Sequence, residues 1–538
     1  MKIVVAEKIA PAAIALFREQ SDWAVVTPDK DSLSTQLADA DALVVRSAVF
    51  VDAAMMDKAP KLRVIGRAGV GVDNIDLDAA TKRGIAVMNT PGGNAVAVAE
   101  HTFGLMLALA RHLTRADATM HAGQWEKKSL QGTELRGKTL GIVGLGRVGI
   151  EVSKRGLAFG MKIVAHDPYV AGTVAQSLQI TLATLDEVFA QADYLTLHVG
   201  LTPQTQRMIN PDSLRKIKRG ARLINCARGE LLDEAAVAEA LQSGQLGGAA
   251  LDVFAHEPLQ SSPLQSTPKV ILTPHIAGST QEAQDAVGVQ IALQIREYLL
   301  KGVIQNAVNI PSITEEEYER MLPYIVLGER LGSFLAQISS GSVEEIALAY
   351  GSELAQWKTE LIRNAALAGV LNQMAHEKAN LVNAASIAQE RGIRLSEQPS
   401  DRDARAGANT LRVTLLTGAE KHTLCGCVLH GNLPRLLEVD GIDIEAPVEG
   451  SLIFLRNRDV PGVVGRVGTV LGEHDINIAN FSLGRGSGRE QANAVAVVQV
   501  DDDINEAVIA DLKKGEAIVF AQAIRFASAS EERLVAAG

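Results

Sequence analysis

Residues 139–149 read TLGIVGLGRVG. An apolar, strand-like run leads into three glycines, Gly144, Gly146 and Gly149, spaced G-x-G-x-x-G, and a helical pattern follows. Glycines at this spacing permit a tight turn and let the backbone approach a pyrophosphate at the helix N-terminus. Asp167 comes 18 residues after Gly149, at the end of the next apolar run, KIVAHD, where a carboxylate binds ribose hydroxyls and disfavours NADP. The stretch therefore predicts a dinucleotide-binding domain.

The motif lies far along the chain, behind a region that has its own β/α rhythm. Residues 1–95 alternate amphipathic stretches with the short apolar runs KIVVA, AVVT, ALVV, RVIG and IAVMN, which predicts a parallel sheet. Residues 96–120 fit one long, largely buried helix. Six further strands are expected between residues 139 and 275, and an amphipathic helix over 282–301. This order predicts one domain inserted into another, with the active site in the cleft between them.

The rest of the chain has a different pattern. After NAVNIPSI, which we interpret as an exit linker, residues 315–448 begin with helical pattern and continue with strands such as TLRVTLLTG and KHTLCGCVLHG. Residues 451–527 follow the order strand, helix, strand, strand, helix, strand, which is ferredoxin-like. The expected fold class is α/β, with two Rossmann-like domains followed by an α+β domain and a ferredoxin-like domain.

Composition narrows the functional class. The 538 residues carry a formal net charge of −11, which argues against nucleic-acid binding as the main role. No apolar run approaches the ~18 residues that span a bilayer. Glu7 and Lys8 interrupt the apolar start, so we expect a first strand there and no signal peptide. Three cysteines form no disulfide framework, and a reducing cytoplasm is the expected compartment.

Two of the cysteines, Cys425 and Cys427, are spaced C-x-C. This spacing suits a pair of metal ligands, but two ligands are too few for a site. The alternation in TLCGCVL places both on one face of a strand. We therefore expect a buried apolar face and no metal site.

Three polar residues follow strand-like runs in the second β/α region. Arg228 follows ARLINCA, Glu257 follows GAALDVF, and His275 follows VILTP. Ligands of open α/β sheets bind at the carboxyl ends of strands, where these residues are expected to converge. An imidazole accepts a proton near neutral pH, a carboxylate beside it holds one tautomer, and a guanidinium grips a carboxylate. Position alone also suits a capping Glu, a surface Arg and an ordinary loop His, so both interpretations stay open.

Longer motifs carry a resemblance to a known family. Residues 141–149, INCARGELLDEAAVAEAL, ALDVFAHEP, PHIAGST and the upstream GRAGVGVDNIDLDAATKRGIAVMNTPGGNAVAVAEH together resemble the D-2-hydroxyacid dehydrogenase family. Over nearly its whole length, the chain resembles the long bacterial members that end in an ACT domain. The resemblance implies NAD-dependent oxidation of 3-phospho-D-glycerate (3-phosphoglycerate) to 3-phosphohydroxypyruvate, the first step of L-serine biosynthesis, with feedback regulation by serine.

The resemblance also implies roles for individual residues. His275 is then the acid/base that takes the hydroxyl proton, Glu257 supports it, and Arg228 binds substrate, either by holding its carboxylate or by polarising the forming carbonyl. Cofactor contacts are implied around the glycine turn and at the strand ends, at Gly144, Gly146, Arg147, Val148, Gly149, Asp167, Cys226, Ala227, Arg228, Asp252, His275 and Gly278. Family members often carry Thr where this chain has Val70 and Val199, so these two positions depart from the family pattern.

A phosphorylated substrate needs more positive charge. Arg46 and Arg67 end strand-like runs of the first region, and neighbouring glycines offer backbone N–H groups. The expected substrate-binding set is Arg46, Ser47, Arg67, Gly69, Val70, Gly71 and Lys127. Lys127, in GQWEKKS, is implied to come from the neighbouring subunit of a homodimer or homotetramer, and an ordinary surface lysine is the alternative.

The stretch RNRDVPGVVGRVGTVLGEHDINIANFS resembles an ACT domain. Asn457, Asp459 and Asn477 match the positions that bind the effector L-serine across a dimer interface in such dehydrogenases. A carboxylate suits the effector's ammonium group, and two amides suit its carboxylate. The same residues are also ordinary turn residues, so turn chemistry remains the alternative.

These expectations combine into four domains. A substrate-binding domain comprises 1–97 and 282–310, an NAD-binding domain 98–281, an intervening α+β domain like an allosteric substrate-binding domain 312–448, and an ACT regulatory domain 451–527. One alternative is another D-2-hydroxyacid dehydrogenase, such as a glyoxylate, hydroxypyruvate or 2-oxoglutarate reductase, but an amino-acid-binding tail favours serine synthesis. The other is a non-catalytic, NAD-sensing corepressor, which the acidic charge and the Arg, Glu and His set disfavour.

Overall fold

The computed structural model describes residues 1–311, 313–374, 378–400, 409–418, 420–486 and 493–526. The expected third and fourth domains include residues outside this description, namely 312, 375–377, 401–408, 419, 487–492 and 527. The chain forms two units, one comprising Thr90–Gln290 and the other Met1–Asn89 with Ile291–Gly538.

The N-terminal part of the larger unit is a five-stranded parallel sheet of order β2-β1-β3-β4-β5. Its strands are β1 (Lys2–Val5), β2 (Ala24–Val26), β3 (Ala42–Val45), β4 (Val64–Arg67) and β5 (Ala86–Met88). The helices between them are α1 (Pro11–Arg18), α2 (Lys30–Gln36), α3 (Ala53–Met56) and α4 (Leu77–Lys82). All four residues of β3 are fully buried, because apolar runs suit strands that are covered on both faces. The five predicted strands are confirmed.

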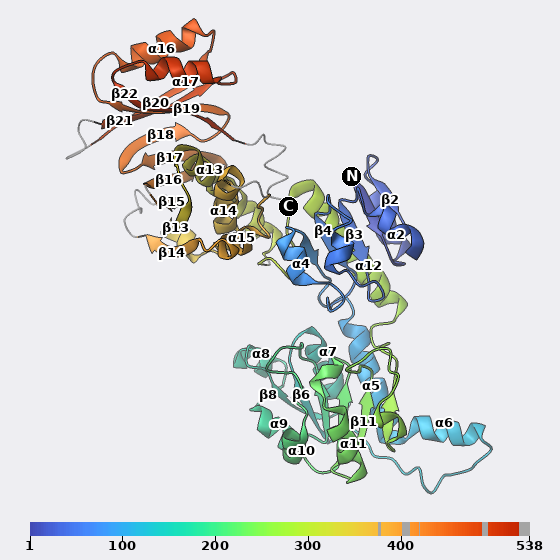
Figure 1. The fold of residues 1–538 in the computed structure, drawn as a ribbon. Helices are drawn as coiled ribbons and strands as arrows, with labels where there is room; N and C mark the ends of the chain where they lie inside the picture. The colour runs from blue at the N-terminus through green and yellow to red at the C-terminus, as the bar shows by residue number, and fades with distance from the viewer. Residues whose placement is uncertain (312, 375–377, 401–408, 419, 487–492, 527–538) are drawn as a thin grey trace. The chain divides into compact units, whose positions relative to one another are not determined.

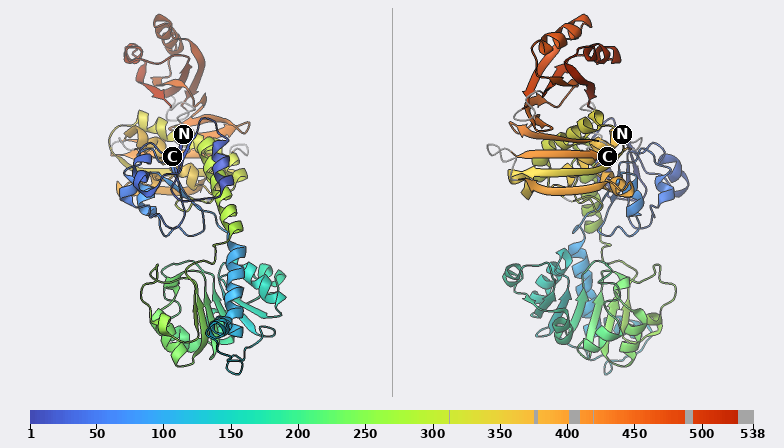
Figure 2. Two further views of the ribbon diagram at one scale, coloured as in Figure 1. Left: turned by 90° about the vertical axis from the view of Figure 1, so that its right-hand side faces the viewer. Right: turned by 60° about the vertical axis from the view of Figure 1, so that its left-hand side comes forward.

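The second unit holds a seven-stranded parallel sheet of order β12-β11-β10-β9-β6-β7-β8, with helices on both faces (Figure 2). Its strands are β6 (Thr139–Val143), β7 (Lys162–His166), β8 (Thr181–Leu182), β9 (Tyr194–Leu197), β10 (Ala221–Asn225), β11 (Leu246–Leu251) and β12 (Val270–Leu272). The helices after β6 are α7 (Arg147–Ala158), α8 (Gly172–Ser177), α9 (Leu185–Gln191), α10 (Pro211–Lys216) and α11 (Glu234–Gln242), with short 3-10 turns at Gly229–Leu231 and Pro263–Ser266. The six expected strands are confirmed, and β8 was missed because two residues carry no periodicity.

The prediction of one long helix over 96–120 is wrong. The segment forms α5 (Ala95–Arg111) and α6 (Leu113–His121), separated by His112 in the left-handed conformation with φ 54°. His112 donates its N–H to Ala108 O, which ends α5, and its ring contacts Gln131 O at 3.3 Å. α5 packs against α7 and the sheet, whereas α6 has no buried residue and projects from the body of the unit (Figure 1).

Helix α12 (Gln281–Lys301) confirms the expected helix over 282–301. The segment after it is more ordered than the predicted linker. The N–H of Val308 donates to Val87 O at 2.8 Å, and Asn309 Oδ1 accepts from Val87 N at 2.9 Å. Asn309 also donates to Ile85 O, so the segment packs along β5.

The third region has a six-stranded mixed sheet of order β14-β13-β15-β16-β17-β18. Its strands are β13 (Val343–Gly351), β14 (Arg394–Ser400), β15 (Thr410–Thr417), β16 (Lys421–Leu429), β17 (Leu433–Val439) and β18 (Ile442–Pro447). Its helices are α13 (Glu315–Ile338), α14 (Glu360–Met374) and α15 (Ala384–Glu390), with a 3-10 turn at Ser352–Gln356. The expected order, helices before strands, is wrong because β13 lies between α13 and α14. Cys425 and Cys427 lie on β16 as buried free thiols.

The C-terminal region has a four-stranded antiparallel sheet of order β20-β21-β19-β22, which two helices cover. The elements are β19 (Ser451–Arg458), α16 (Val463–Glu473), β20 (Ile478–Arg485), β21 (Asn493–Val500), α17 (Glu506–Lys513) and β22 (Ile518–Arg525). This order confirms the ferredoxin-like prediction, and with it the expected fold class. Among the described residues, no helix has the length and apolar character to cross a membrane.

Candidate active site

The glycine turn between β6 and α7 tolerates only glycine at two of its three positions. Gly144 has φ +97°, and a Cβ there would lie 2.5 Å from His198 O. A Cβ at Gly149 would lie 2.1 Å from Gly144 O, because α7 packs directly onto the turn. Gly146 is different, since a Cβ there would have no atom within 4 Å. Gly146 is the N-cap of α7 and makes no side-chain capping bond, so the helix N-terminus suits a diphosphate.

Asp167 lies directly after β7 and is fixed against the same turn. Its Oδ2 accepts the Leu145 N–H at 2.8 Å, and its Oδ1 accepts the Tyr169 N–H at 2.9 Å. The carboxylate therefore bridges the glycine turn and the loop that follows β7. This placement fits the ribose end of a dinucleotide. Arg147 packs over Gly92, and Val148 packs against the core cluster between α5 and the sheet.

His275 and Glu257 form a close pair beyond the ends of β12 and β11. The distance between His275 Nδ1 and Glu257 Oε2 is 2.6 Å. This hydrogen bond raises the pKa of His275 above its ordinary value, although burial opposes the change and Arg228 lowers it. Burial by itself raises the pKa of the Glu257 carboxyl, but hydrogen bonds from His275 and from the Phe254 N–H outweigh it and hold that pKa low. Nδ1 therefore carries a proton toward Glu257 and leaves Nε2 free to accept one.

The loop that carries His275 is held by Asp252, whose side chain is fully buried. Asp252 Oδ1 accepts from Thr273 Oγ1 at 2.6 Å and from Ile276 N at 2.9 Å, and Oδ2 accepts from Ala277 N at 2.8 Å. Burial alone raises the pKa of this carboxyl, but the hydrogen bonds it accepts outweigh burial and keep it ionised. His275 has φ +53°, and its N–H donates to Asp252 O at 2.8 Å. A conformation that costs energy for a non-glycine residue is thus held by the bonds around it.

Arg228 lies in a loop after β10 that is fixed from beneath. The fully buried Asn225 donates to Arg228 O at 2.8 Å and accepts from Ala227 N at 3.0 Å. Gly229 lets this loop approach the loop after β11, because a Cβ there would lie 1.9 Å from Phe254 C. Arg228, Glu257 and His275 therefore all belong to loops at the carboxyl edge of one parallel sheet, as the sequence predicts.

Two other expected cofactor contacts lie in the same unit. Cys226 directly follows β10 and has 8% of its surface exposed, and burial raises the pKa of its thiol to about 12, so it behaves as a small apolar group. A Cβ at Gly278 would lie 2.8 Å from Asn94 Nδ2. Val199, one of the positions that departs from the family pattern, lies against Gly144.

In the other unit, the loop after β3 carries Arg46 and Ser47 and is fixed from two sides. Glu7, two residues beyond β1, accepts the N–H of Arg46 at 2.8 Å, of Val49 at 3.0 Å and of Ala48 at 3.2 Å. Asn74 donates to Arg46 O at 2.9 Å and to Val49 O at 2.6 Å. The backbone around Arg46 is therefore rigid, and Ser47 is exposed.

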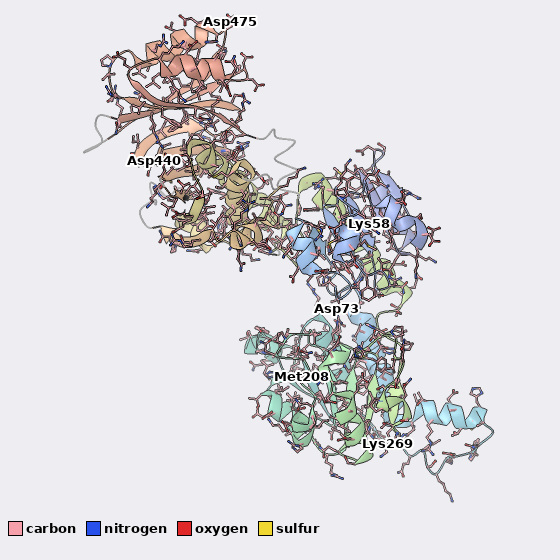
Figure 3. The ribbon with its side chains drawn as sticks, viewed as in Figure 1. Lys58, Asp73, Met208, Lys269, Asp440 and Asp475 are labelled. Atoms are coloured by element: carbon pink, nitrogen blue, oxygen red, sulfur yellow. The ribbon has the colours of Figure 1, made fainter. Side chains whose placement is uncertain are left out.

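Arg67 ends β4, and its guanidinium lies over Gly69. A Cβ at Gly69, which has φ +150°, would lie 1.4 Å from Arg67 Nη1. Val70 is 37% exposed, and its carbonyl accepts from Asn89 Nδ2 at 2.6 Å. Gly71 follows in the same loop, which continues to Asp73 (Figure 3). Lys127 belongs to the other unit. It is exposed and lies two residues after Trp125, which is itself 78% exposed.

The three expected effector residues each contact a different neighbour. Asn457 Nδ2 donates to Arg458 O at 2.8 Å, Asp459 lies 3.4 Å from Arg485 Nε, and Asn477 Nδ2 donates to Asp501 Oδ2 at 2.6 Å. Within the described part of the chain, no hydrogen bond joins the three to one another. Asn457 Oδ1 is buried and has no hydrogen-bond partner among the described residues, which suits a group that receives a donor from a ligand.

Several residues that fix these loops were not predicted from the sequence. The side chains of Glu7 and Asn74 bind the backbone of the Arg46 loop, and the Thr273 hydroxyl binds the Asp252 carboxylate. Glu7 follows β1 as Arg228 follows β10, so the rule of strand carboxyl ends was the available signal for it. Thr273 directly follows β12 and carried the same signal, whereas Asn74 carried none.

Comparison with known proteins assigns the chain to a family. A parallel sheet with this glycine turn, and with Arg228, Glu257 and His275 at its carboxyl edge, is typical of an NAD-dependent dehydrogenase. The family model described as D-isomer specific 2-hydroxyacid dehydrogenase, NAD binding domain, matches residues 103–277. The D-3-phosphoglycerate dehydrogenase intervening domain matches 320–440, and the ACT domain matches 451–514.

Relatives match over nearly the whole length. D-3-phosphoglycerate dehydrogenase from Methanocaldococcus jannaschii is 42% identical over 516 residues, which is 96% of this chain and 98% of the relative. The Synechocystis enzyme of the same name is 38% identical, covering 95% of this chain and 92% of the relative. The chain belongs to the D-3-phosphoglycerate dehydrogenase family. It is an NAD-dependent oxidoreductase that oxidises 3-phosphoglycerate to 3-phosphohydroxypyruvate in serine biosynthesis.

Solved structures agree over the part they cover. The TT0316 protein from Thermus thermophilus is 36% identical with a TM-score of 0.52, covering 57% of this chain and all of that chain. A glyoxylate reductase from Paecilomyes thermophila is 30% identical with a TM-score of 0.52, covering 57% of this chain and 98% of that chain.

Proposed function

We propose that His275 is the general acid/base of the reaction, that Glu257 holds its imidazole, and that Arg228 binds the substrate carboxylate. The 2.6 Å contact between His275 Nδ1 and Glu257 Oε2 is the observation that carries this assignment. Because Nδ1 donates to the carboxylate, the lone pair on Nε2 is available to the C2 hydroxyl. The resulting imidazolium is stabilised by the Glu257 charge.

NAD, when bound, accepts the hydride from C2. The residues proposed to bind it are Gly144, Gly146, Arg147, Val148, Gly149, Asp167, Cys226, Ala227, Arg228, Asp252, His275 and Gly278. The open N-terminus of α7 suits the diphosphate, and Asp167 suits the ribose hydroxyls. A carboxylate at this place repels the extra phosphate of NADP, so the preference is for NAD.

The substrate phosphate is proposed to bind the larger unit through Arg46, Ser47, Arg67, Gly69, Val70 and Gly71. The fixed backbone around Arg46 supports this proposal, because only the side chain is left to be ordered when the arginine binds an anion. Lys127 is proposed to act on the phosphate of a neighbouring subunit. Its exposed position beside Trp125, on a segment that follows the projecting helix α6, is compatible with a contact to a second copy of the chain.

The proposed domain organisation keeps the expected boundaries. A substrate-binding domain comprises 1–97 and 282–310, an NAD-binding domain 98–281, an intervening domain 312–448 and an ACT domain 451–527. The ACT domain is proposed to bind L-serine at Asn457, Asp459 and Asn477 in a homodimer or homotetramer. The orphaned Oδ1 of Asn457 supports this proposal. Three free cysteines support a cytoplasmic location.

The catalytic assignment is tested by His275→Asn. Asn keeps a polar group of smaller size but cannot take up the proton. NADH formation from 3-phosphoglycerate should fall by about three orders of magnitude or more, while the Kd for NADH, read by fluorescence, stays within a few fold. Turnover near that of the native enzyme contradicts the assignment.

A further inference from the structure

The buried carboxylate of Asp252 has one more neighbour, which comes from a distant part of the chain. His101 lies on α5, and its Nε2 is 3.2 Å from Thr273 Oγ1 and 3.4 Å from Asp252 Oδ1. Asp252 and Thr273 flank the loop that carries His275, and all these residues belong to the same unit. His101 thus reaches the underside of that loop from a helix 172 residues earlier in the chain.

The hydrogen-bond pattern decides which nitrogen of His101 carries a proton. Thr273 Oγ1 donates its only hydrogen to Asp252 Oδ1 at 2.6 Å, so it can only accept from His101. Asp252 is ionised and also only accepts. Nε2 of His101 must therefore carry a hydrogen, which it shares between Thr273 Oγ1 and Asp252 Oδ1.

We infer that His101 is a positioning residue for His275, acting through Asp252 and Thr273. The inference rests on the proposed role of His275 as acid/base. The side chain of Asp252 takes the N–H groups of Ile276 and Ala277, the two residues that directly follow His275. His101 completes the set of donors around this carboxylate and so fixes the loop from beneath.

The consequence is kinetic. Without the His101 donor, the buried carboxylate keeps Thr273 and two backbone N–H groups but loses a fourth donor, and the loop can relax. A displacement of His275 by about 1 Å is enough to cost about 100-fold in rate. Asn225 holds the Arg228 loop, and Asp252, a proposed NAD contact, keeps its bonds to Thr273, Ile276 and Ala277. The loss therefore falls on kcat and leaves KM.

The test compares His101→Leu, which removes the donor, with His101→Gln, whose amide nitrogen reaches the place of Nε2. Glu100→Gln is the matched control, because Glu100 is the neighbour of His101 on α5 and pairs with Arg155 at 3.1 Å, away from Asp252. For each variant, kcat and KM for 3-phosphoglycerate are measured together with the Kd for NADH. His101→Leu should lower kcat about 10- to 100-fold with KM and Kd within about twofold. His101→Gln should recover most of the loss, and Glu100→Gln should be unchanged.

Three results overturn the inference. The first is a kcat of His101→Leu within twofold of the native enzyme, and the second is a kcat of His101→Gln no higher than that of His101→Leu. The third is a rise in KM and Kd that parallels the fall in kcat, since it reveals a structural role. If His101→Leu does not fold, His101→Gln is compared with His101→Asn, whose amide reaches only the place of Nδ1. Equal kcat values for these two variants overturn the inference. A kcat that is tenfold higher for His101→Gln supports it. His275→Asn runs in the same assay. If that variant turns over normally, it is the proposed catalytic role that fails, whatever the His101 variants do.

Discussion

Gly149→Ala tests whether the turn between β6 and α7 is built as described. A Cβ at this position would lie 2.1 Å from Gly144 O, a separation that requires the helix or the turn to move. The obstacle is backbone, so no side-chain rotation relieves it. Overpacking of this kind costs about 1–3 kcal/mol. In a domain of about 150–250 residues, each kcal/mol lowers Tm by about 2–4 °C, so we expect a loss of about 2–12 °C.

Gly146→Ala is the matched control for that variant. A Cβ at Gly146 has no atom within 4 Å, and φ is −68°, so the backbone accommodates alanine. Its methyl group would stand at the N-cap of α7, where the diphosphate needs close approach of the backbone. This variant should keep its Tm and lose NAD affinity by about tenfold, or about 1.4 kcal/mol.

The two variants are separated by measuring thermal unfolding without cofactor and the NADH Kd by fluorescence titration. Cofactor is left out of the unfolding experiment because a bound ligand raises Tm by mass action. The reasoning is refuted if Gly149→Ala keeps both its Tm and its Kd, or if Gly146→Ala binds NADH as tightly as the native enzyme.

Three further predictions concern the proposed residues. Glu257→Gln removes the charge that raises the pKa of His275. Because oxidation needs neutral His275, the acid limb of kcat/KM against pH should move to lower pH, and kcat should fall at least about tenfold. An acid limb that stays in place contradicts this prediction. Glu7→Ala frees three N–H groups around Arg46 and should raise KM for 3-phosphoglycerate about tenfold with little change in kcat, measured by steady-state kinetics; Glu19→Ala, an exposed partner of Arg296, is its control. Asn457→Ala should weaken serine binding in a calorimetric titration of the full chain by at least about tenfold, with kcat unchanged; unaltered serine affinity removes Asn457 from the effector site.

Much of the fold was predictable because local pattern determines it. Apolar runs such as ALVV and ARLINCA become buried strands, and the three glycines identify the β6–α7 turn. The break at His112 was not predictable, because a left-handed residue inside a helical pattern carries no Gly or Asn signal. The placement of β13 between two helices was missed although SSGS at 339–342 marks a turn before it, because the apolar residues at 343, 346 and 350 of VEEIALAYG also fit a helical spacing.

The candidate site divides in the same way. Arg228, Glu257 and His275 were found because each follows a strand, and parallel strands bring their carboxyl ends to one edge. Two residues that fix loops of the site were not found: His101, which lies against the His275 loop, and Asn74, which holds the Arg46 loop. Their contacts span 172 and 28 positions in the chain, and a distant hydrogen bond leaves no periodicity in sequence. These supporting residues can be identified only from the tertiary structure.

The central claim is that one imidazole, that of His275, takes the proton in oxidation and returns it in reduction. The most direct measurement is the pH dependence of kcat/KM in both directions, with 3-phosphoglycerate and NAD, and with 3-phosphohydroxypyruvate and NADH. The account predicts that oxidation rises and reduction falls with pH through one shared apparent pKa, which lies above that of free imidazole because of the hydrogen bond to Glu257. Profiles that rise together, or that show no titration in this range, contradict it.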